Sequence, residues 1–179
     1  MKILKKILFA ILGLVALALI VALFVKKDYA VERQITINKP RQDVFDYIKF
    51  LKNQNEYSVW ATKDPAMKKE YKGTDGTVGF ISAWDSNNKE VGKGEQEILK
   101  IADGERIDSK LRFKVPFEAE DDAYMITEDN GTNQTKVKWG FKGKMNYPMN
   151  LMLLCMDMDE MIGKDLDNGL SKLKTVLEK

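Results

Sequence analysis

The chain has 179 residues, enough for one modest domain and an appendage, and its 44% hydrophobic and 31% charged residues are ordinary for a globular protein. Its formal net charge is only +2, so no strong electrostatic field favours nucleic acid, and we expect no DNA or RNA partner. The sequence contains no histidine, which excludes Ser-His and Cys-His catalysis and removes the usual protein ligand of metal ions. We therefore predict no metal site and no cofactor.

The N-terminal segment predicts a membrane anchor. Residues 7–25 carry no charged or strongly polar side chain, and as a helix they would extend about 28 Å, close to the hydrocarbon thickness of a bilayer. Lysines flank this segment on both sides, and Tyr29 follows where an interfacial aromatic residue is expected. A cleaved signal peptide is the alternative, but its apolar region usually has about 7–15 residues and ends in small residues. We predict a single-pass anchor over residues 1–27 and a domain over residues 28–179, placed on the extracytoplasmic side.

The domain begins with an alternating segment, Val31–Ile37, which predicts a strand. Pro40 then follows a capping-type residue, and apolar side chains at helical spacing predict a short helix as far as Leu51. We expect the polar stretch 52–63 to turn back across the sheet. Turn residues separate six further expected strands, which are Lys68–Lys72, Val78–Trp84, Val91–Ile101, Arg106–Val115, Ala119–Thr127 and Gln134–Phe141. Consecutive hairpins indicate an antiparallel meander.

The strand Arg106–Val115 shows the clearest alternation of side chains. Its charged residues lie on one face, and the other face carries Ile107, Ser109, Leu111, Phe113 and Val115. Such a pattern indicates a sheet with one buried face and one solvated face. The next strand is ambiguous, because Tyr124 with Ile126 and Ala123 with Met125 are equally plausible inward pairs.

The last part of the chain, Tyr147–Glu178, has apolar residues at three- and four-residue steps and predicts one long amphipathic helix. At about 1.5 Å per residue, this helix would extend roughly 48 Å and cross the whole domain. Cys155 lies on its apolar stripe, so we expect a buried packing thiol rather than a nucleophile. Flexible methionine side chains recur beside the stripe and suit either a surface that repacks around varied ligands or an irregular core.

Several short motifs occur in a fixed order along the domain. They are Ile35–Pro40 leading to Val44-Phe45, Gly76-Thr-Val-Gly79 followed by Trp84, Val91-Gly-Lys-Gly94, Leu111-Arg-Phe113 with Pro116-Phe117, and Gly169–Lys174. From Val31 onward the chain thereby resembles the SRPBCC superfamily, the START-like and birch-pollen-allergen-like helix-grip proteins. Within it, the chain resembles membrane-anchored proteins of the polyketide cyclase/dehydrase and lipid transport type. The resemblance implies an α+β helix-grip fold, in which a curved antiparallel sheet of about seven strands wraps a long C-terminal helix, with two short helices after the first strand.

The resemblance also implies a cavity between sheet and helix that holds an apolar ligand. We expect its walls to include inward-facing aromatic, apolar and small polar side chains together with methionines of the last helix. These candidates are Phe80, Trp84, Ser109, Leu111, Phe113, Tyr124, Trp139, Met152 and Met158. An ordinary packed core is the alternative for the same aromatic and methionine residues.

Three functions are compatible with these expectations. The first is binding of a hydrophobic small molecule or lipid near the membrane that supplies it, by a carrier or sensor. The second is a cyclase- or dehydratase-like enzyme acting on an apolar carbonyl compound, which without histidine would need Tyr124 or a buried carboxylate such as Asp122 as acid or base. The third is a ligand-free interaction module of the cell envelope. A cavity separates the third function from the other two, and a carboxylate or tyrosine inside it favours the second.

Overall fold

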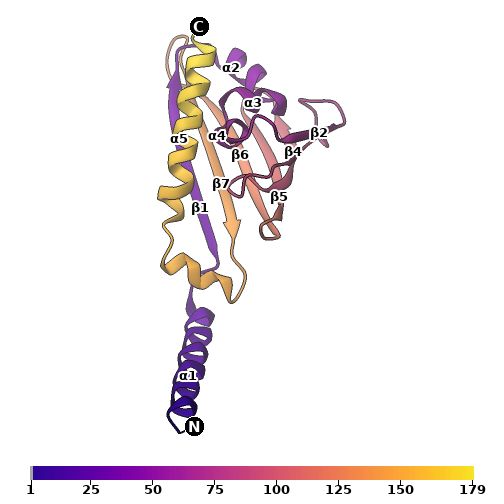
Figure 1. Cartoon of the computed structure of the whole chain (residues 1–179). Coiled ribbons are helices and arrows are strands. Elements are labelled where there is room, and N and C mark those ends of the chain that lie inside the picture. The colour runs from indigo at the N-terminus through magenta and orange to yellow at the C-terminus, as the bar shows by residue number, and fades with distance from the viewer. Residues whose placement is uncertain (1) are drawn as a thin grey trace.

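The computed structural model describes residues 2–179. Helix α1 (Lys2–Phe24) extends away from the rest of the molecule, and Ala22 is its one buried residue (Figure 1). By length and composition, it is the one helix among residues 2–179 that is long and apolar enough to cross a membrane. The remainder of the chain forms a sheet covered on one side by helices.

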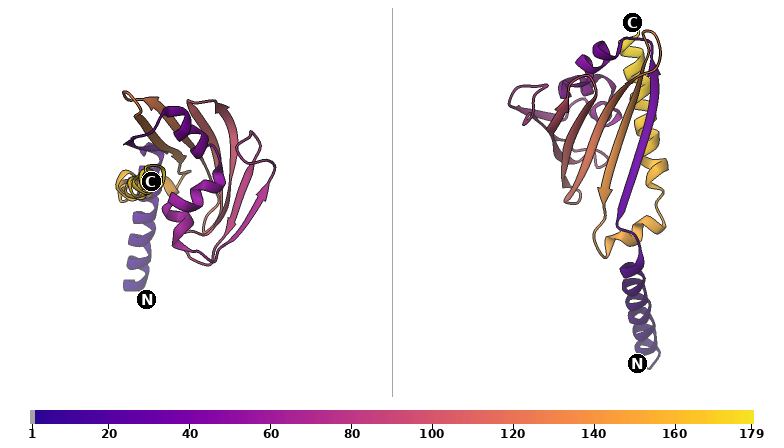
Figure 2. Two further views of the ribbon diagram at one scale, coloured as in Figure 1. Left: turned by 90° about the horizontal axis from the view of Figure 1, so that it is seen from above. Right: turned by 180° about the vertical axis from the view of Figure 1, so that it is seen from behind.

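Seven antiparallel strands form one sheet in the order β1-β7-β6-β5-β4-β3-β2. The strands are β1 (Asp28–Ile37), β2 (Lys68–Lys72), β3 (Ile81–Asp85), β4 (Lys93–Ala102), β5 (Arg106–Val115), β6 (Ala119–Asp129) and β7 (Thr135–Lys144). Strands β2 to β7 pair with their neighbours in sequence, and β1 pairs with β7, so the predicted meander is confirmed. The sheet is curved, with α5 and the short helices on its concave side (Figure 2).

The predicted strand Val78–Trp84 is wrong at its start. Strand β3 begins only at Ile81, because Gly73, Gly76 and Gly79 all have positive φ angles, between 76° and 89°, and keep this segment in turns. Val78 is therefore 61% exposed rather than part of the inward face. In contrast, the bounds of β2 and β5 agree with the sequence prediction.

Strand β6 resolves the ambiguity about its inward face. Its buried residues alternate as Asp121, Ala123, Met125 and Thr127, so the pair Ala123 and Met125 faces the core. Tyr124 consequently lies on the outer face of the sheet. Of the predicted inward side chains of β5, Ile107, Ser109 and Leu111 are buried, whereas Phe113 is partly exposed and Val115, at the end of the strand, is 43% exposed.

The segment after β1 forms four short helical pieces rather than two. They are α2 (Arg41–Ile48), the 3-10 helix η1 (Leu51–Asn53), α3 (Gln54–Tyr57) and α4 (Val59–Lys63). The side chains expected to be buried in this region, from Val44 to Leu51, enter the core. The Asp75 carboxylate accepts hydrogen bonds from the backbone N–H groups of Leu51 and Lys52, at 2.8 and 3.1 Å, and so stabilises the start of η1.

The single helix predicted for Tyr147–Glu178 is wrong, because the chain breaks into the 3-10 helix η2 (Met149–Leu154) and helix α5 (Met158–Leu177). Asp157 is extended, and its side chain accepts a hydrogen bond from the Glu160 N–H at 3.0 Å, which starts a new helix. Cys155 therefore lies between the two helices and is exposed, so the expected buried thiol is also wrong.

Helix α5 packs across β1 and β7 and contributes Leu166, Leu170 and Leu173 to the main apolar cluster. Gly169 permits this close approach, since a Cβ atom at that position would lie 2.8 Å from Cζ3 of Trp139. At the other end of the contact, Arg33 of β1 forms ion pairs with Asp159 and Asp167 of α5, at 2.8 and 3.1 Å. Apolar burial and these ion pairs fix the helix along the edge of the sheet.

Candidate functional site

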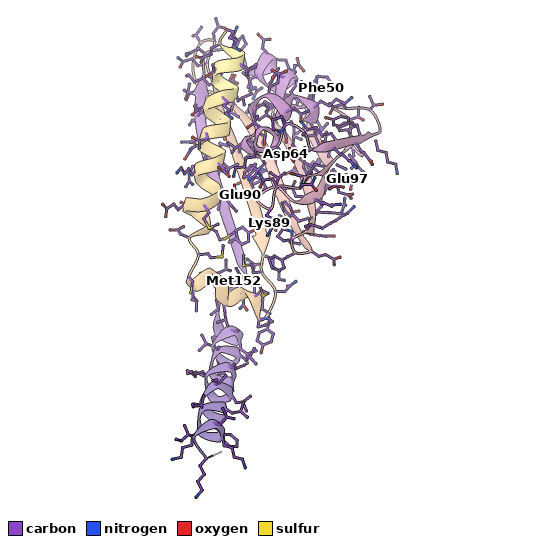
Figure 3. The ribbon with its side chains drawn as sticks, viewed as in Figure 1. Phe50, Asp64, Lys89, Glu90, Glu97 and Met152 are labelled. Carbon is purple, nitrogen blue, oxygen red and sulfur yellow. The ribbon has the colours of Figure 1, made fainter. Side chains whose placement is uncertain are left out.

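A cleft of about 1240 Å³ lies on the concave side of the sheet. Its walls come from all seven strands, from α3, α4 and α5, from residues 89–91 and from η2. Figure 3 shows Met152 on η2, close to α1, with Lys89 and Glu90 farther from that helix. Ligand pockets usually measure about 300–1,000 Å³, so the cleft can accommodate a sizeable small molecule.

Five of the nine candidate residues line this cleft. They are Trp84, Leu111, Phe113, Trp139 and Met152. The indole N–H of Trp84 donates to the Val91 carbonyl at 3.2 Å, and the Trp84 ring meets Phe113 edge to face, with 6.0 Å between their centroids. Because these contacts orient both rings, they form a defined apolar wall.

Three other candidates lie in or against the packed core instead of on the cleft wall. Phe80 is 1% exposed and stacks on Tyr71, with 6.1 Å between ring centroids, so it belongs to the core and not to the cleft wall. Met158 also packs against the core cluster. Ser109 borders a separate crevice of about 10 Å³, which holds no more than about one water molecule. The prediction that these side chains line the cavity is wrong for the cleft described here.

Tyr124 is the ninth candidate and lies on the opposite face of the sheet. Its hydroxyl donates to Oε2 of Glu32 at 2.6 Å, and the Arg106 guanidinium lies 4.6 Å from its ring centroid. Partial burial and the Glu32 carboxylate raise the pKa of Tyr124 to about 12, so it keeps its proton at neutral pH. The prediction that Tyr124 lines the cavity or supplies its acid is therefore wrong.

Asp122 is not the buried carboxylate either, because its side chain is 59% exposed and pairs with Lys110 on the outer face. The neighbouring residue, Asp121, is the buried carboxylate instead. Asp121 is only 7% exposed, and both it and Tyr29 line the cleft. The Tyr29 hydroxyl donates to Oδ2 of Asp121 at 3.1 Å, so the cleft contains a buried carboxylate bonded to a partly buried tyrosine.

The electrostatics of this pair follow from its burial. Burial raises the pKa of the Asp121 carboxyl above its ordinary value, although hydrogen bonds from the Tyr29 hydroxyl and the Lys144 backbone N–H favour the ionised form. Burial and the adjacent carboxylate also raise the pKa of Tyr29, so its hydroxyl remains a donor at neutral pH. Asp121 can therefore exchange a proton or accept a hydrogen bond from a polar group on a ligand.

Gly143 provides the space that this pair occupies. It faces Tyr29 across the β1–β7 ladder, and a Cβ atom there would lie 2.2 Å from Cζ of Tyr29 and 2.6 Å from Oδ1 of Asp121. Sequence reasoning missed the pair because the first strand was expected to begin at Val31. Since β1 begins at Asp28, the same alternation that buries Val31 also turns Tyr29 inward.

The acidic residues do not form an evident metal site. Among residues 2–179, no three carboxylate or thiol side chains lie close enough together to hold a metal ion. The chemistry available in the cleft is therefore that of apolar contact, hydrogen bonding and charged groups, among which Asp121 is the buried carboxyl group, whereas Glu90 and Glu118 are exposed.

The raised pKa of Asp121 predicts a pH dependence of stability. Between the ordinary aspartate pKa of about 3.9 and the higher pKa in the folded domain, the folded state binds more protons than the unfolded state. The contribution of Asp121 to the free energy of unfolding is therefore present at low pH and is lost as pH rises through this window. In the Asp121→Asn variant, this decrease in the free energy of unfolding with rising pH is expected to be absent.

Chemical denaturation of the full chain in detergent micelles, followed by tryptophan fluorescence at a series of pH values, measures this effect. Trp60, Trp84 and Trp139 all lie in the domain and report its unfolding. The difference in unfolding free energy between wild type and Asp121→Asn isolates the carboxyl group. A difference that does not change between pH 4 and neutral pH contradicts the assignment.

Comparison with known proteins establishes the fold through solved structures. No protein-family model and no curated protein matches the sequence. Solved structures do match, among them truncated norcoclaurine synthase from Thalictrum flavum, at 9% identity and a TM-score of 0.63 over 86% of this chain and 95% of that one. The Aha1 dimer protein from Colwellia psychrerythraea matches at 15% identity and a TM-score of 0.54, over 84% and 96% of the two chains. The chain therefore has a helix-grip fold, in which a curved antiparallel sheet is packed against a long C-terminal helix.

A third match, to Ara h 8.0201, has 12% identity and a TM-score of 0.55 over 84% of this chain and 95% of that one. At such identities, the likeness establishes the fold alone. It confirms the sequence-based prediction of a curved sheet of seven antiparallel strands with a long C-terminal helix.

Proposed function

We propose that the helix-grip domain binds a hydrophobic small molecule or lipid in the cleft, as a carrier or sensor beside the membrane that supplies the ligand. The observation that carries this proposal is the cleft itself, with about 1240 Å³ of space next to Trp84, Phe113 and Trp139. A solidly packed interaction module would fill this space with side chains, because protein interiors are close-packed. The cleft therefore favours the binder over the ligand-free module.

The position of α1 supports the membrane part of the proposal. This helix is long and apolar and contacts the domain chiefly through its last turn, so nearly all of its apolar surface is uncovered. An apolar helix of that length is stable in a bilayer and costly to hydrate. We infer that α1 anchors the domain, so that a ligand dissolved in the bilayer has a short path to the cleft.

Native mass spectrometry of the full chain, released from mild detergent, tests the binding proposal. The expected result is a population carrying additional mass from co-purified lipid or another apolar molecule. Ala123→Phe provides a matched variant, because Ala123 lies on the cleft wall and a phenyl group there would occupy ligand space. The proposal predicts less bound mass for this variant. A wild-type protein that carries no apolar molecule, and takes up none from added lipid mixtures, contradicts it.

An enzymatic function is the second candidate, and the pair of Tyr29 and Asp121 favours it. A buried carboxyl group with a raised pKa suits general acid–base chemistry, and Tyr29 can donate to a carbonyl oxygen nearby. We infer that a cyclase- or dehydratase-like activity on an apolar carbonyl compound would use Asp121, in place of the Tyr124 or Asp122 expected from the sequence.

Deuterium exchange into the α-carbon of an added long-chain methyl ketone distinguishes the two candidates. In the enzyme, the Asp121 carboxylate removes the α-proton, and deuterium from the solvent returns to the same carbon. Wild type would then catalyse exchange and Asp121→Asn would not, while both proteins bind the ketone. Equal exchange rates in the two proteins leave binding alone as the function.

A further inference from the structure

The 3-10 helix η2 is attached to the end of α1. Asn150 is fully buried, and its side-chain amide donates to the carbonyl oxygens of Ala22 and Val25, at 2.7 and 3.0 Å. The backbone N–H of Met145 donates to the Lys27 carbonyl at 2.8 Å, which fixes the start of the same segment. The last carbonyl groups of a helix lack partners within that helix, so these bonds also cap α1. η2 therefore lies beside the last turn of α1, as Figures 1 and 2 show.

The surface of η2 and its neighbours is unusually apolar for exposed residues. Leu154 is 62% exposed, Met149 is 46% exposed and Tyr147 is 42% exposed, and the nearby Phe24 at the end of α1 is 85% exposed. Large contiguous apolar patches on soluble surfaces usually mark a site of interaction with protein or membrane. Phe24 belongs to α1 itself, and Asn150 holds η2 against the last turn of that uncovered apolar helix, which identifies the bilayer as the partner that fits the patch.

Charged and aromatic residues beside the patch fit the same partner. Lys26, Lys27 and Lys144 are exposed near the junction of α1 and the domain, where they can contact anionic lipid headgroups. Tyr147 is of the type that is enriched at the boundary between headgroups and acyl chains. Asp28 is the exposed acidic residue next to these three lysines, so the net charge at this junction remains positive.

Two residues connect this patch with the cleft. Met149 and Met152 line the cleft and are also exposed, at 46% and 37%. We propose that η2, with Tyr147, lies in the interfacial layer of the bilayer and forms the rim over which an apolar ligand passes between membrane and cleft. This inference rests on the proposed function, because it requires that α1 spans the membrane. It adds the route of the ligand and the segment that forms the route.

Site-specific quenching tests the position of η2. The protein has a single cysteine, Cys155, which is exposed directly after η2 and can carry an environment-sensitive fluorophore. The full chain would be placed in nanodiscs whose lipids carry a spin label near the headgroup or at the end of an acyl chain. Three further proteins, all with Cys155→Ser, place the label elsewhere by Leu154→Cys, Leu12→Cys or Thr132→Cys.

The four labels have different expected results. Labels at positions 154 and 155 should lose fluorescence to the headgroup spin label, and the Leu12→Cys label in α1 should lose it to the deep spin label. The Thr132→Cys label lies in the turn between β6 and β7 and should lose neither. Quenching at position 12 without quenching at 154 and 155 overturns this inference alone. Absence of quenching at position 12 overturns the anchor and this inference together, while the ligand-binding proposal keeps its own test by mass spectrometry.

A matched pair of substitutions tests the route of the ligand. Leu154 and Val78 are equally exposed apolar residues, at 62% and 61%, and neither lines the cleft, but Val78 lies far from η2 in the loop before β3. Leu154→Asp is expected to slow the transfer of a fluorescent fatty acid from nanodiscs to the protein, with its affinity in detergent unchanged. Val78→Asp should leave both unchanged. Equal transfer rates for the two variants would show that η2 is not the rim.

Discussion

Replacing Leu170 by alanine is expected to lower the free energy of unfolding of the domain by about 2–5 kcal/mol. Leu170 is 1% exposed in the middle of α5 and belongs to the apolar cluster that α5 forms with the sheet and α2. Its truncation removes apolar contacts and leaves a cavity that the neighbouring leucines and Trp139 cannot fill without moving the helix. Since α5 also borders the cleft at Ile162, the loss should weaken the fold and the site together.

Leu154→Ala is the control for this prediction, because it makes the same chemical change at a residue that is 62% exposed. Its expected effect is within about 0.5 kcal/mol. Both variants can be measured by chemical denaturation of the full chain in micelles, with tryptophan fluorescence as the signal. A cost for Leu170→Ala no larger than that for Leu154→Ala would mean that α5 does not contribute to the core as described.

Much of the sheet could be predicted from the sequence, because successive side chains of a strand point to opposite faces of the sheet. In β5, apolar and charged residues alternate over ten positions, and burial of the apolar face follows directly from strand geometry. β6 lacks such a contrast, since both of its faces carry apolar and acidic residues. Its register is set by pairing with β5 and β7, which depends on contacts between strands and not on the pattern within one strand.

The error at the C-terminal helix has a different origin. Apolar residues continue at helical spacing from η2 into α5, so periodicity alone gives no reason for a break. The break occurs at Asp157, whose side chain caps α5, and η2 turns instead toward α1, where Asn150 finds its partners. The partners of Asn150 are more than 120 residues away in sequence, and local patterns do not contain that information.

The candidate site was predicted in part for the same reasons. Trp84, Leu111 and Phe113 are on strands with a clear inward face and do reach the cleft. By alternation along the predicted strand, Phe80 would share the inward face with Trp84. It precedes β3 in a glycine-rich turn, however, and is buried against Tyr71. The pair of Tyr29 and Asp121 combines one residue next to the anchor with one in the ambiguous strand, and Gly143 makes room for both. Such a site becomes visible only when three strands are placed side by side.

Phe113→Ala is expected to weaken ligand binding more than it weakens the fold. Phe113 is partly exposed, lines the cleft near the end of β5 and contacts Trp84 edge to face. Its truncation enlarges a space that already exists, so the cost in stability should be below the roughly 3–5 kcal/mol typical of a packed phenylalanine. A bound apolar molecule, in contrast, would lose an aromatic surface, which in general contributes about 0.5–1.5 kcal/mol beyond its area when paired with another ring.

Phe45→Ala provides the matched control, because Phe45 is fully buried in α2 and does not line the cleft. Denaturation and titration with a fluorescent fatty acid, both on the full chain in micelles, should give opposite rankings for the two variants. Phe45→Ala should show the larger loss of stability, and Phe113→Ala the larger loss of affinity. If Phe113→Ala costs as much stability as Phe45→Ala and leaves the affinity unchanged, Phe113 is a core residue, and the ligand lies elsewhere along the cleft.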